Sequence, residues 1–167
     1  RLGVCLNYNG YGTNLEDLHW DPADLFRELA PYADPRDFLA HREDLFEALS
    51  TGYDEDMANA AAVAAESESA GSALFLLPDA PWARRVSGVF GNRLANEHPE
   101  RAHAVATWKP GGGLVISVRA PLKRRSGADE LCRRFATGGG RAAAAGINHL
   151  EEADLGRFRE ALRAQYG

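Results

Sequence analysis

The sequence predicts an α/β fold in which a mixed β-sheet is flanked by helices and preceded by an α-helical connecting segment. Residues 1–70 carry apolar side chains at helical spacing, whereas residues 71–167 alternate short apolar runs with helical patterns. The length of 167 residues, 45% of them hydrophobic, suits a compact domain with a helical appendage. The small and polar stretch 66–72 marks the boundary between the two parts.

In the first part we expect one strand and then helices. Alternating apolar residues at 2–6 predict an opening strand. An Asp–Pro pair predicts a helix at residues 21–29, with the aspartate as N-cap and the proline at the first helical position. A second Asp–Pro pair begins a helix at residues 35–52 that ends near a glycine, and an Ala-rich helix follows at residues 54–70.

The second part is expected to build the sheet. Gly88 and Gly91 lie inside one of its predicted helices, where each costs ~1 kcal/mol of helix propensity relative to alanine, so they indicate close packing or a nearby ligand. The elements in order are a strand at 73–78, a helix at 81–97, strands at 102–108 and 114–119 joined by a hairpin, a helix at 126–135 capped by Ser126, a glycine loop, and a helix at 151–166.

Composition and charge exclude several classes of protein. The net charge of −5 argues against a protein that coats DNA, so any anion site has to be local. No apolar run approaches the roughly 20 residues that span a bilayer, and no signal-peptide pattern opens the chain, so we expect no membrane partner. Cys5 and Cys132 match no metal or redox spacing and are interpreted as free thiols of a cytoplasmic protein. The chain starts with Arg1 rather than Met, which suggests a piece of a longer protein.

The least ordinary stretch of the sequence is FATGGGRAAAAGI at residues 135–147. The consecutive amides of Gly138, Gly139 and Gly140 are unshielded by side chains and can form a concave anion site. Arg141 adds a planar, permanently charged donor fork that suits phosphate. The four alanines that follow keep the backbone thin, so a ligand can come close. A flexible loop with a solvated arginine is the alternative interpretation.

A second set of polar side chains lies on the predicted strand LVISVRAP at residues 114–121. Side chains alternate along a strand, so Ser117 and Arg119 share one face. A hydroxyl and a guanidinium at this spacing can clamp a phosphate or a carboxylate. The alternative is an exposed polar face with a surface ion pair. Residues 119–127 form the most basic stretch of a net-acidic chain.

These two segments together resemble a known family. A strand that ends in Ser-x-Arg, followed by a helix and then by ATGGGRAAAAG, is similar to the substrate-binding domain of DHH-family phosphoesterases, the RecJ-like superfamily. The resemblance covers residues 71–167 and implies that residues 1–70 are the tail of a catalytic domain plus a helical linker. It also implies that Ser117 and Arg119 hold a phosphate or the terminal nucleotide.

The glycine loop carries the rest of the implied site, with one departure from the family. The amides of residues 138–140 would grip the same phosphate. Family members usually have a histidine where this chain has Arg141, which keeps a positive charge but cannot act as an acid or base. Asn92 would reach the pocket from the preceding helix, and Asn148 would fix the shape of the loop.

A second difference from the family pattern determines whether we expect this chain to hydrolyse its ligand. The family hydrolyses phosphate esters with two divalent metals, typically manganese, and an Asp-His-His motif supplies some of the ligands. That motif is absent from this sequence. The resemblance therefore implies a part that binds the phosphate of a nucleotide or of a short single-stranded nucleic acid and does not cleave it alone. Manganese or another divalent metal is expected only in a full-length family member, and no cofactor is expected in this chain.

Three other interpretations stay open. Asp17, His19 and Asp21 alternate and could form a metal cluster on a strand, although a helix N-cap with solvated neighbours explains them more simply. The glycine loop could hold the pyrophosphate of a cofactor, as in a coenzyme A binder or a transferase, but such a loop normally opens a helix. The helices of residues 22–70 could instead form a structural homodimer through the small side chains of residues 58–65.

Overall fold

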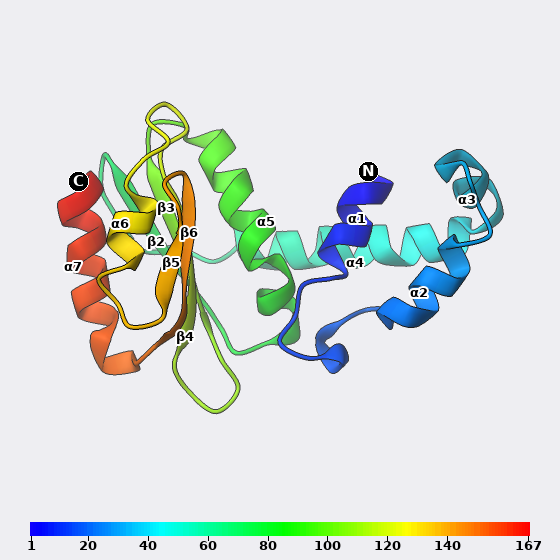
Figure 1. Cartoon of the computed structure of the whole chain (residues 1–167), viewed down its shortest axis with the longest axis horizontal. Coiled ribbons are helices and arrows are strands. Elements are labelled where there is room, and N and C mark those ends of the chain that lie inside the picture. Colours follow the sequence, from blue (N-terminus) through cyan, green and yellow to red (C-terminus); the bar gives the residue numbers. More distant parts are fainter. The chain divides into compact units, whose positions relative to one another are not determined.

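The computed structural model describes residues 1–167 and divides into two compact units (Figure 1). Unit 1 comprises residues 1–60 and 81–86, and unit 2 comprises residues 61–80 and 87–167. The predicted fold class is confirmed, because unit 2 holds a six-stranded mixed β-sheet with flanking helices and the N-terminal segment is helical. None of the helices is both long enough and apolar enough to cross a membrane.

Unit 1 consists of capped helices that bury an apolar stripe. The carboxylates of Asp21 and Asp34 accept backbone N–H groups at the starts of two helices, and a proline follows each, as predicted. The core cluster of its N-terminal helices contains the buried side chains of Cys5, Leu25, Phe38, Leu45 and Leu49. The elements are α1 (Leu2–Tyr8), the 3₁₀ turn η1 (Leu15–Asp17), α2 (Pro22–Leu29), α3 (Pro35–His41) and α4 (Glu43–Ala61).

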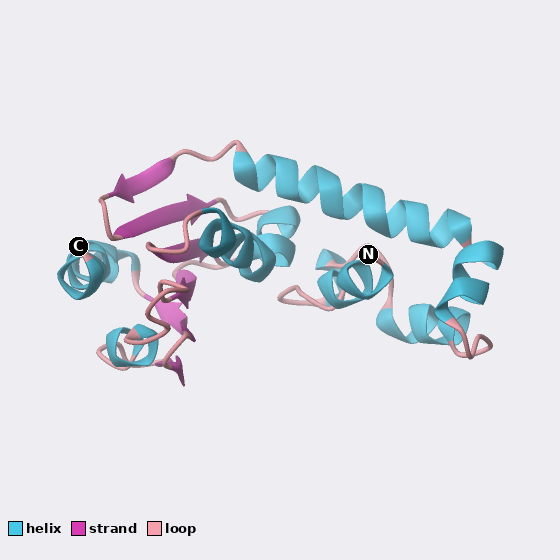
Figure 2. Ribbon diagram, turned by 90° about the horizontal axis from the view of Figure 1, so that it is seen from above, coloured by secondary structure: helices cyan, strands magenta, loops and turns pink.

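Three expectations for this unit are wrong. The helix expected at residues 35–52 is interrupted at Arg42, where α3 ends before α4 begins. Residues 2–8 form helix α1 rather than a strand, because Leu2, Cys5 and Leu6 follow helical spacing and pack into the core. The helix expected to end near Gly52 continues through it to Ala61. Figure 2 shows α4 as one long, unbroken helix. The ring of His19 lies 2.7 Å from the position that a Cβ of Gly52 would take. This glycine therefore makes room for a neighbour and does not end the helix.

The sheet of unit 2 has the strand order β1-β2-β3-β4-β6-β5. β2 and β3 are parallel, with α5 between them in sequence, and every other neighbouring pair is antiparallel. The elements are β1 (Ala65–Glu68), β2 (Ser72–Leu77), α5 (Pro81–Glu97), β3 (Ala102–Trp108), β4 (Leu114–Arg119), α6 (Ala128–Cys132), β5 (Gly138–Arg141), β6 (Ala144–Leu150), the 3₁₀ turn η2 (Glu152–Asp154) and α7 (Leu155–Tyr166). The first six residues of α5 belong to unit 1 and the rest to unit 2.

The structure corrects three further elements. The Ala-rich helix ends at Ala61 and gives way to β1, whose side chains alternate between half-buried and exposed. Gly127, not Ser126, is the N-cap of α6. The glycine loop and the alanines after it form the antiparallel pair β5 and β6. The predicted domain boundary at 70/71 falls in the turn between β1 and β2.

The two faces of the sheet differ in chemistry. On β4, Ile116 and Val118 point into the main core, which β2, β3, β6, α6 and α7 complete; Figure 1 shows α6 and α7 on this side. Phe75 of β2 points to the other face, where its ring lies 5.4 Å from that of Phe90 in α5. The polar side chains of β4 therefore point to the face that carries α5.

Candidate functional site

The register of the sheet brings residues of two separate segments into two parallel rows. Ser117 and Gly139 pair with the same glycine of β6 from its two sides. Arg119 and Arg141 likewise share one alanine of β6. Paired residues of neighbouring strands point to the same face, as do residues two apart on one strand, so all four lie on one face. Each row spans two strand spacings, about 10 Å.

Hydrogen bonds to neutral oxygens orient the guanidinium of Arg119. Its Nε donates to Oδ1 of Asn92 at 2.6 Å, and its Nη1 donates to Oγ of Ser117 at 2.8 Å. Its Nη2 lies 3.4 Å from the carbonyl oxygen of Gly88. The sequence therefore named three residues, Asn92, Ser117 and Arg119, that the structure brings into direct contact.

The glycines inside α5 make room for this arginine. A Cβ at Gly91 would lie 3.7 Å from Cγ of Arg119, and one at Gly88 would lie 3.9 Å from its Nη2. Longer side chains at these positions would displace the guanidinium from the sheet face. The helix-propensity cost of the two glycines thus coincides with the place where α5 crosses the arginine.

The glycine stretch is a strand, so its backbone does not form the expected nest. Successive amides of a strand point in opposite directions and cannot converge on one anion. The N–H of Gly138 donates to the carbonyl oxygen of Phe135 at 2.9 Å. Gly139 has nothing within 4 Å of its Cβ position, so it leaves an open floor on the face of Ser117 and Arg119.

Two of the predicted residues differ from this group in their surroundings. Arg141 is exposed and ends β5. Asn148 is exposed and lies four residues beyond the alanine of β6 that pairs with Arg119, about 13 Å along the strand. Its backbone N–H donates to the carbonyl oxygen of Thr137 at 3.3 Å. Asn148 therefore supports the β5–β6 pair and is not brought to the arginine.

Sequence reasoning missed His103, which pairs with Arg119 across the β3–β4 ladder. Its ring is 1% exposed, and neither ring nitrogen has a hydrogen-bond partner. Burial lowers the pKa of His103 to about 4, so the ring is neutral at neutral pH. The sequence signal that could have found it is a histidine inside AHAVATW, a run of mostly apolar residues.

The alternating residues of DLHWD do not form a metal cluster. Asp21 caps α2, and buried Asp17 pairs with Arg84 at 2.5 Å. The hydrogen bond from Arg84 is the main reason why the pKa of Asp17 falls to about 2. No three His, Cys, Asp or Glu side chains lie close enough together to hold a metal ion. Asp17 and Asp21 therefore have separate structural partners.

The second acid–arginine pair of unit 1 belongs to a buried polar network. Arg85 donates from Nε to Asp56 at 2.7 Å, and the hydroxyl of Tyr8 also donates to Asp56. His19 places Nε2 2.8 Å from that hydroxyl. Burial opposes ionisation of Asp56, but the hydrogen bonds from His19, Arg85 and Tyr8 outweigh it and lower its pKa to about 2.

Comparison with known proteins finds relatives among solved structures. No protein-family model and no curated protein matches the sequence. RecJ from Thermus thermophilus, solved with Mg²⁺, superimposes with a TM-score of 0.58 and 19% identity over 86% of this chain and 22% of that chain. The DHH domain of a member of the S1p family of ribosomal proteins superimposes with a TM-score of 0.56 and 13% identity. This match covers 87% of this chain and 37% of that chain. The pGpG-specific phosphodiesterase PggH from Vibrio cholerae superimposes with a TM-score of 0.53 and 17% identity, over 88% of this chain and 51% of that chain.

These likenesses show that the chain has the fold of part of the DHH-family proteins. The chain spans 22% to 51% of the length of those three structures. RecJ has also been solved with Mn²⁺.

Proposed function

We propose that the chain is the substrate-binding part of a DHH-family phosphoesterase, and that it binds a phosphate of a nucleotide or of a short single-stranded nucleic acid. The observation that carries the proposal is the fixed guanidinium of Arg119, held by Asn92 and Ser117 beside the open backbone of Gly139. The fold shared with RecJ and PggH supports the same class.

Arg119 is the principal phosphate ligand in this proposal. Its bonds to the oxygens of Asn92 and Ser117 orient the guanidinium. A pre-oriented guanidinium loses little freedom on binding and offers a planar fork to two phosphate oxygens. The hydroxyl of Ser117 can rotate to donate to the same group.

The floor of the site is backbone rather than side chain. Gly139 leaves open space, and β5 is an edge strand, so its outward N–H groups are not taken by a neighbouring strand. A sugar or base can lie on this floor with its phosphate beside Arg119. Arg141 adds a second permanent charge about 10 Å away, two strand spacings across the sheet.

The proposed role is binding without hydrolysis. Arg119 and Arg141 stay protonated and cannot exchange a proton at neutral pH. His103 is the nearest titratable group in the ladder, but its ring is buried. In this proposal the metal ions of the family, which would activate the attacking water, require ligands from outside this chain.

A calorimetric titration tests the proposal. The purified chain is titrated with adenosine 3′,5′-bisphosphate, short single-stranded RNA and cyclic dinucleotides at low and moderate salt. We expect saturable binding to at least one ligand and about tenfold or greater weakening in Arg119→Ala, since one charge-assisted hydrogen bond contributes about 1.5–3 kcal/mol. Arg133→Ala is the control, because Arg133 is an exposed arginine of unit 2 paired with Asp129.

The same samples separate the alternatives. Absence of saturable binding to every ligand contradicts the proposal. If the chain is then dimeric by light scattering, the structural homodimer explains the helical segment better. Binding of coenzyme A with no binding of nucleotides favours the pyrophosphate cofactor class.

A further inference from the structure

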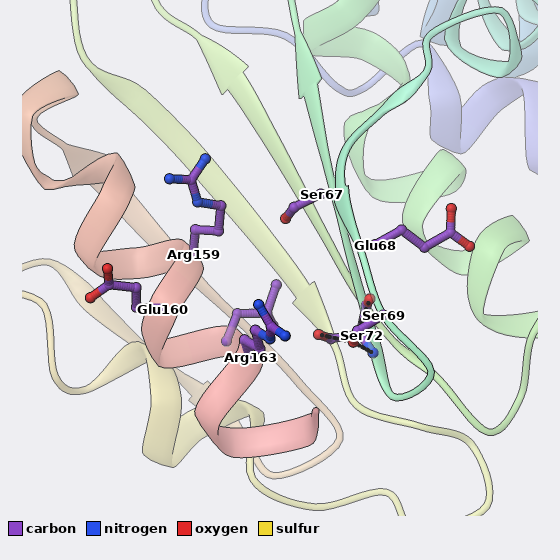
Figure 3. Close-up of a pocket in the computed structure, with 8 residues that line it drawn as sticks. Ser67, Glu68, Ser69, Ser72, Arg159, Glu160 and Arg163 are labelled. Atoms are coloured by element: carbon purple, nitrogen blue, oxygen red, sulfur yellow. Dashed lines mark hydrogen bonds between the residues drawn. The ribbon is translucent and has the colours of Figure 1, made fainter.

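A pocket lies at the opposite edge of the sheet from the glycine strand. It has a volume of about 450 Å³ and lies between the β1–β2 hairpin and α7, within unit 2 (Figure 3). β1 is one edge of the sheet and β5 is the other, so this pocket is separate from the site around Arg119. Its walls are polar and include three serines and two arginines.

The hairpin wall is a fixed cluster of hydroxyl groups. Ser72 is 5% exposed, and its N–H donates to Oγ of Ser69 at 3.1 Å. The hydroxyl oxygens of these two residues are also 3.1 Å apart, and the hydroxyl of Ser69 donates to the carbonyl oxygen of Ser72 at 3.3 Å. Rotation about its C–O bond can turn this donor towards a ligand. The main-chain carbonyl of Tyr166 occupies the place that a Cβ of Gly71 would take, so this glycine lets the hairpin lie directly against the end of α7.

The helix wall presents two arginines one turn apart. Arg159 and Arg163 are an i,i+4 pair, and like charges at this spacing destabilise a helix. Arg163 makes no side-chain hydrogen bond or ion pair, and Figure 3 shows its guanidinium beside Ser69 and Ser72. Arg159 lies 3.5 Å from the carboxylate of Glu66, and both side chains are about half exposed, 49% and 42%. An anion between the two guanidinium groups would relieve their repulsion.

The acidic residues of the pocket do not cancel this charge. Figure 3 shows the carboxylates of Glu68 and Glu160 pointing away from the serines. The carboxylate of Glu68 is paired with Arg101. Hydroxyl donors and a cation without a carboxylate partner therefore face the same space.

We propose that this pocket binds a phosphorylated small molecule through its phosphate group. Arg163 is the main ligand and Arg159 the second cation, and the hydroxyls of Ser69 and Ser72 supply the remaining donors. Fork-shaped guanidinium donors and hydroxyls together match the oxygens of a phosphate. The volume of about 450 Å³ is within the range of about 300–1,000 Å³ for small-molecule sites, so it leaves room for an organic group on the phosphate.

Nuclear magnetic resonance of the ¹⁵N-labelled chain tests the proposal with inorganic phosphate as the probe. The titration is done at constant ionic strength, with chloride as the compensating ion. We expect saturable shifts of the amides of Ser69, Gly71 and Ser72. In Arg163→Gln the dissociation constant read from these amides should rise about tenfold or more. The control Arg133→Gln removes the exposed arginine at the C-cap of α6 and should leave the constant unchanged.

Three outcomes overturn the proposal. They are hairpin shifts that grow linearly without saturating in the wild-type chain, saturable shifts with the same constant in Arg163→Gln, and equal loss in the Arg133→Gln control. If Arg163→Gln unfolds, Arg163→Lys takes its place and should still weaken binding, because lysine lacks the planar fork. Repeating the titration in Arg119→Ala separates this site from the proposed nucleotide site, since the hairpin shifts should persist there.

Discussion

At the scale of single residues, the candidate site depends on how Arg119 is held. Asn92 accepts from Nε at 2.6 Å, and this bond fixes the plane of the guanidinium. We expect Asn92→Ala to weaken nucleotide binding about threefold to tenfold while the free energy of unfolding changes by about 1 kcal/mol or less. Calorimetry and chemical denaturation measure the two quantities.

Asn96→Ala is the matched control for that variant. Asn96 lies one turn further along α5, is exposed, and donates only to the carbonyl oxygen of Asn92. Equal affinities in the two variants would contradict the orienting role of Asn92.

A second prediction concerns the glycines of β5, because the space available for a side chain differs between neighbouring positions. A Cβ at Gly138 would overlap the carbonyl of Cys132, whereas a Cβ at Gly139 meets nothing within 4 Å. We expect Gly138→Ala to lower the free energy of unfolding by about 1–3 kcal/mol. Gly139→Val should keep the fold and reduce nucleotide binding, because its side chain would cover the open floor.

Denaturation and titration of both variants check this contrast. Unchanged nucleotide affinity in a folded Gly139→Val would remove the glycine floor from the site.

At the scale of elements, α4 and the first residues of α5 are joined by the buried pair of Asp56 and Arg85. Removing one partner of a buried pair leaves the other charge uncompensated, which costs about 3–5 kcal/mol. We therefore expect Asp56→Ala to destabilise unit 1 by this amount in chemical denaturation. Asp54→Ala is the control, because Asp54 lies on the same helix as Asp56 and pairs with Arg1, but its side chain is 64% exposed. Such an exposed pair contributes about 1 kcal/mol or less. A similar loss of unfolding free energy in both variants would show that burial does not make the pair of Asp56 and Arg85 the more stabilising one.

The elements that the sequence predicted well are those whose pattern is local. Proline-led caps and apolar spacing located α2 and α5, and alternating apolar residues located β3 and β4. The strand β5 could not be predicted in this way, since three glycines have no side-chain period and only pairing with β6 makes them a strand. The prediction of a strand at residues 2–6 was wrong for a related reason, because alternation over so few positions fits helical spacing as well.

The candidate site was predictable in part. Ser117 and Arg119 share a face by strand period alone, so their contact followed from sequence. The direct bond between Arg119 and Asn92 depends on how α5 lies on the sheet, and the resemblance to the DHH family pointed to it where the residue pattern could not. His103 was missed because its place beside Arg119 follows from the β3–β4 register.

At the scale of the whole molecule, two lowered carboxylate pKa values predict acid sensitivity. The pKa values of Asp17 and Asp56 are about 2 in the folded chain and about 3.9 in an unfolded one. The stability that they contribute, on the order of 2 kcal/mol each, is fully present above about pH 5 and is lost as the pH falls through about 4 towards about 2. Denaturation at a series of pH values measures this loss.

Asp17→Asn checks the source of that acid sensitivity. We expect the variant to be less stable than the wild-type chain at about pH 7 and to lose less stability between about pH 5 and about pH 2. An unchanged pH dependence would show that other carboxyl groups carry the effect.

For the whole molecule, we infer that a net-acidic chain binds the phosphate of a nucleotide at a local cation, Arg119. The most direct measurement is the ratio of the dissociation constants of adenosine 3′,5′-bisphosphate for Arg119→Ala and for the wild-type chain, at the same salt concentration. We predict a ratio of about ten or more with an unchanged thermal unfolding midpoint. A ratio near one, with saturable binding in both chains, would contradict the claim and place the phosphate elsewhere on the molecule.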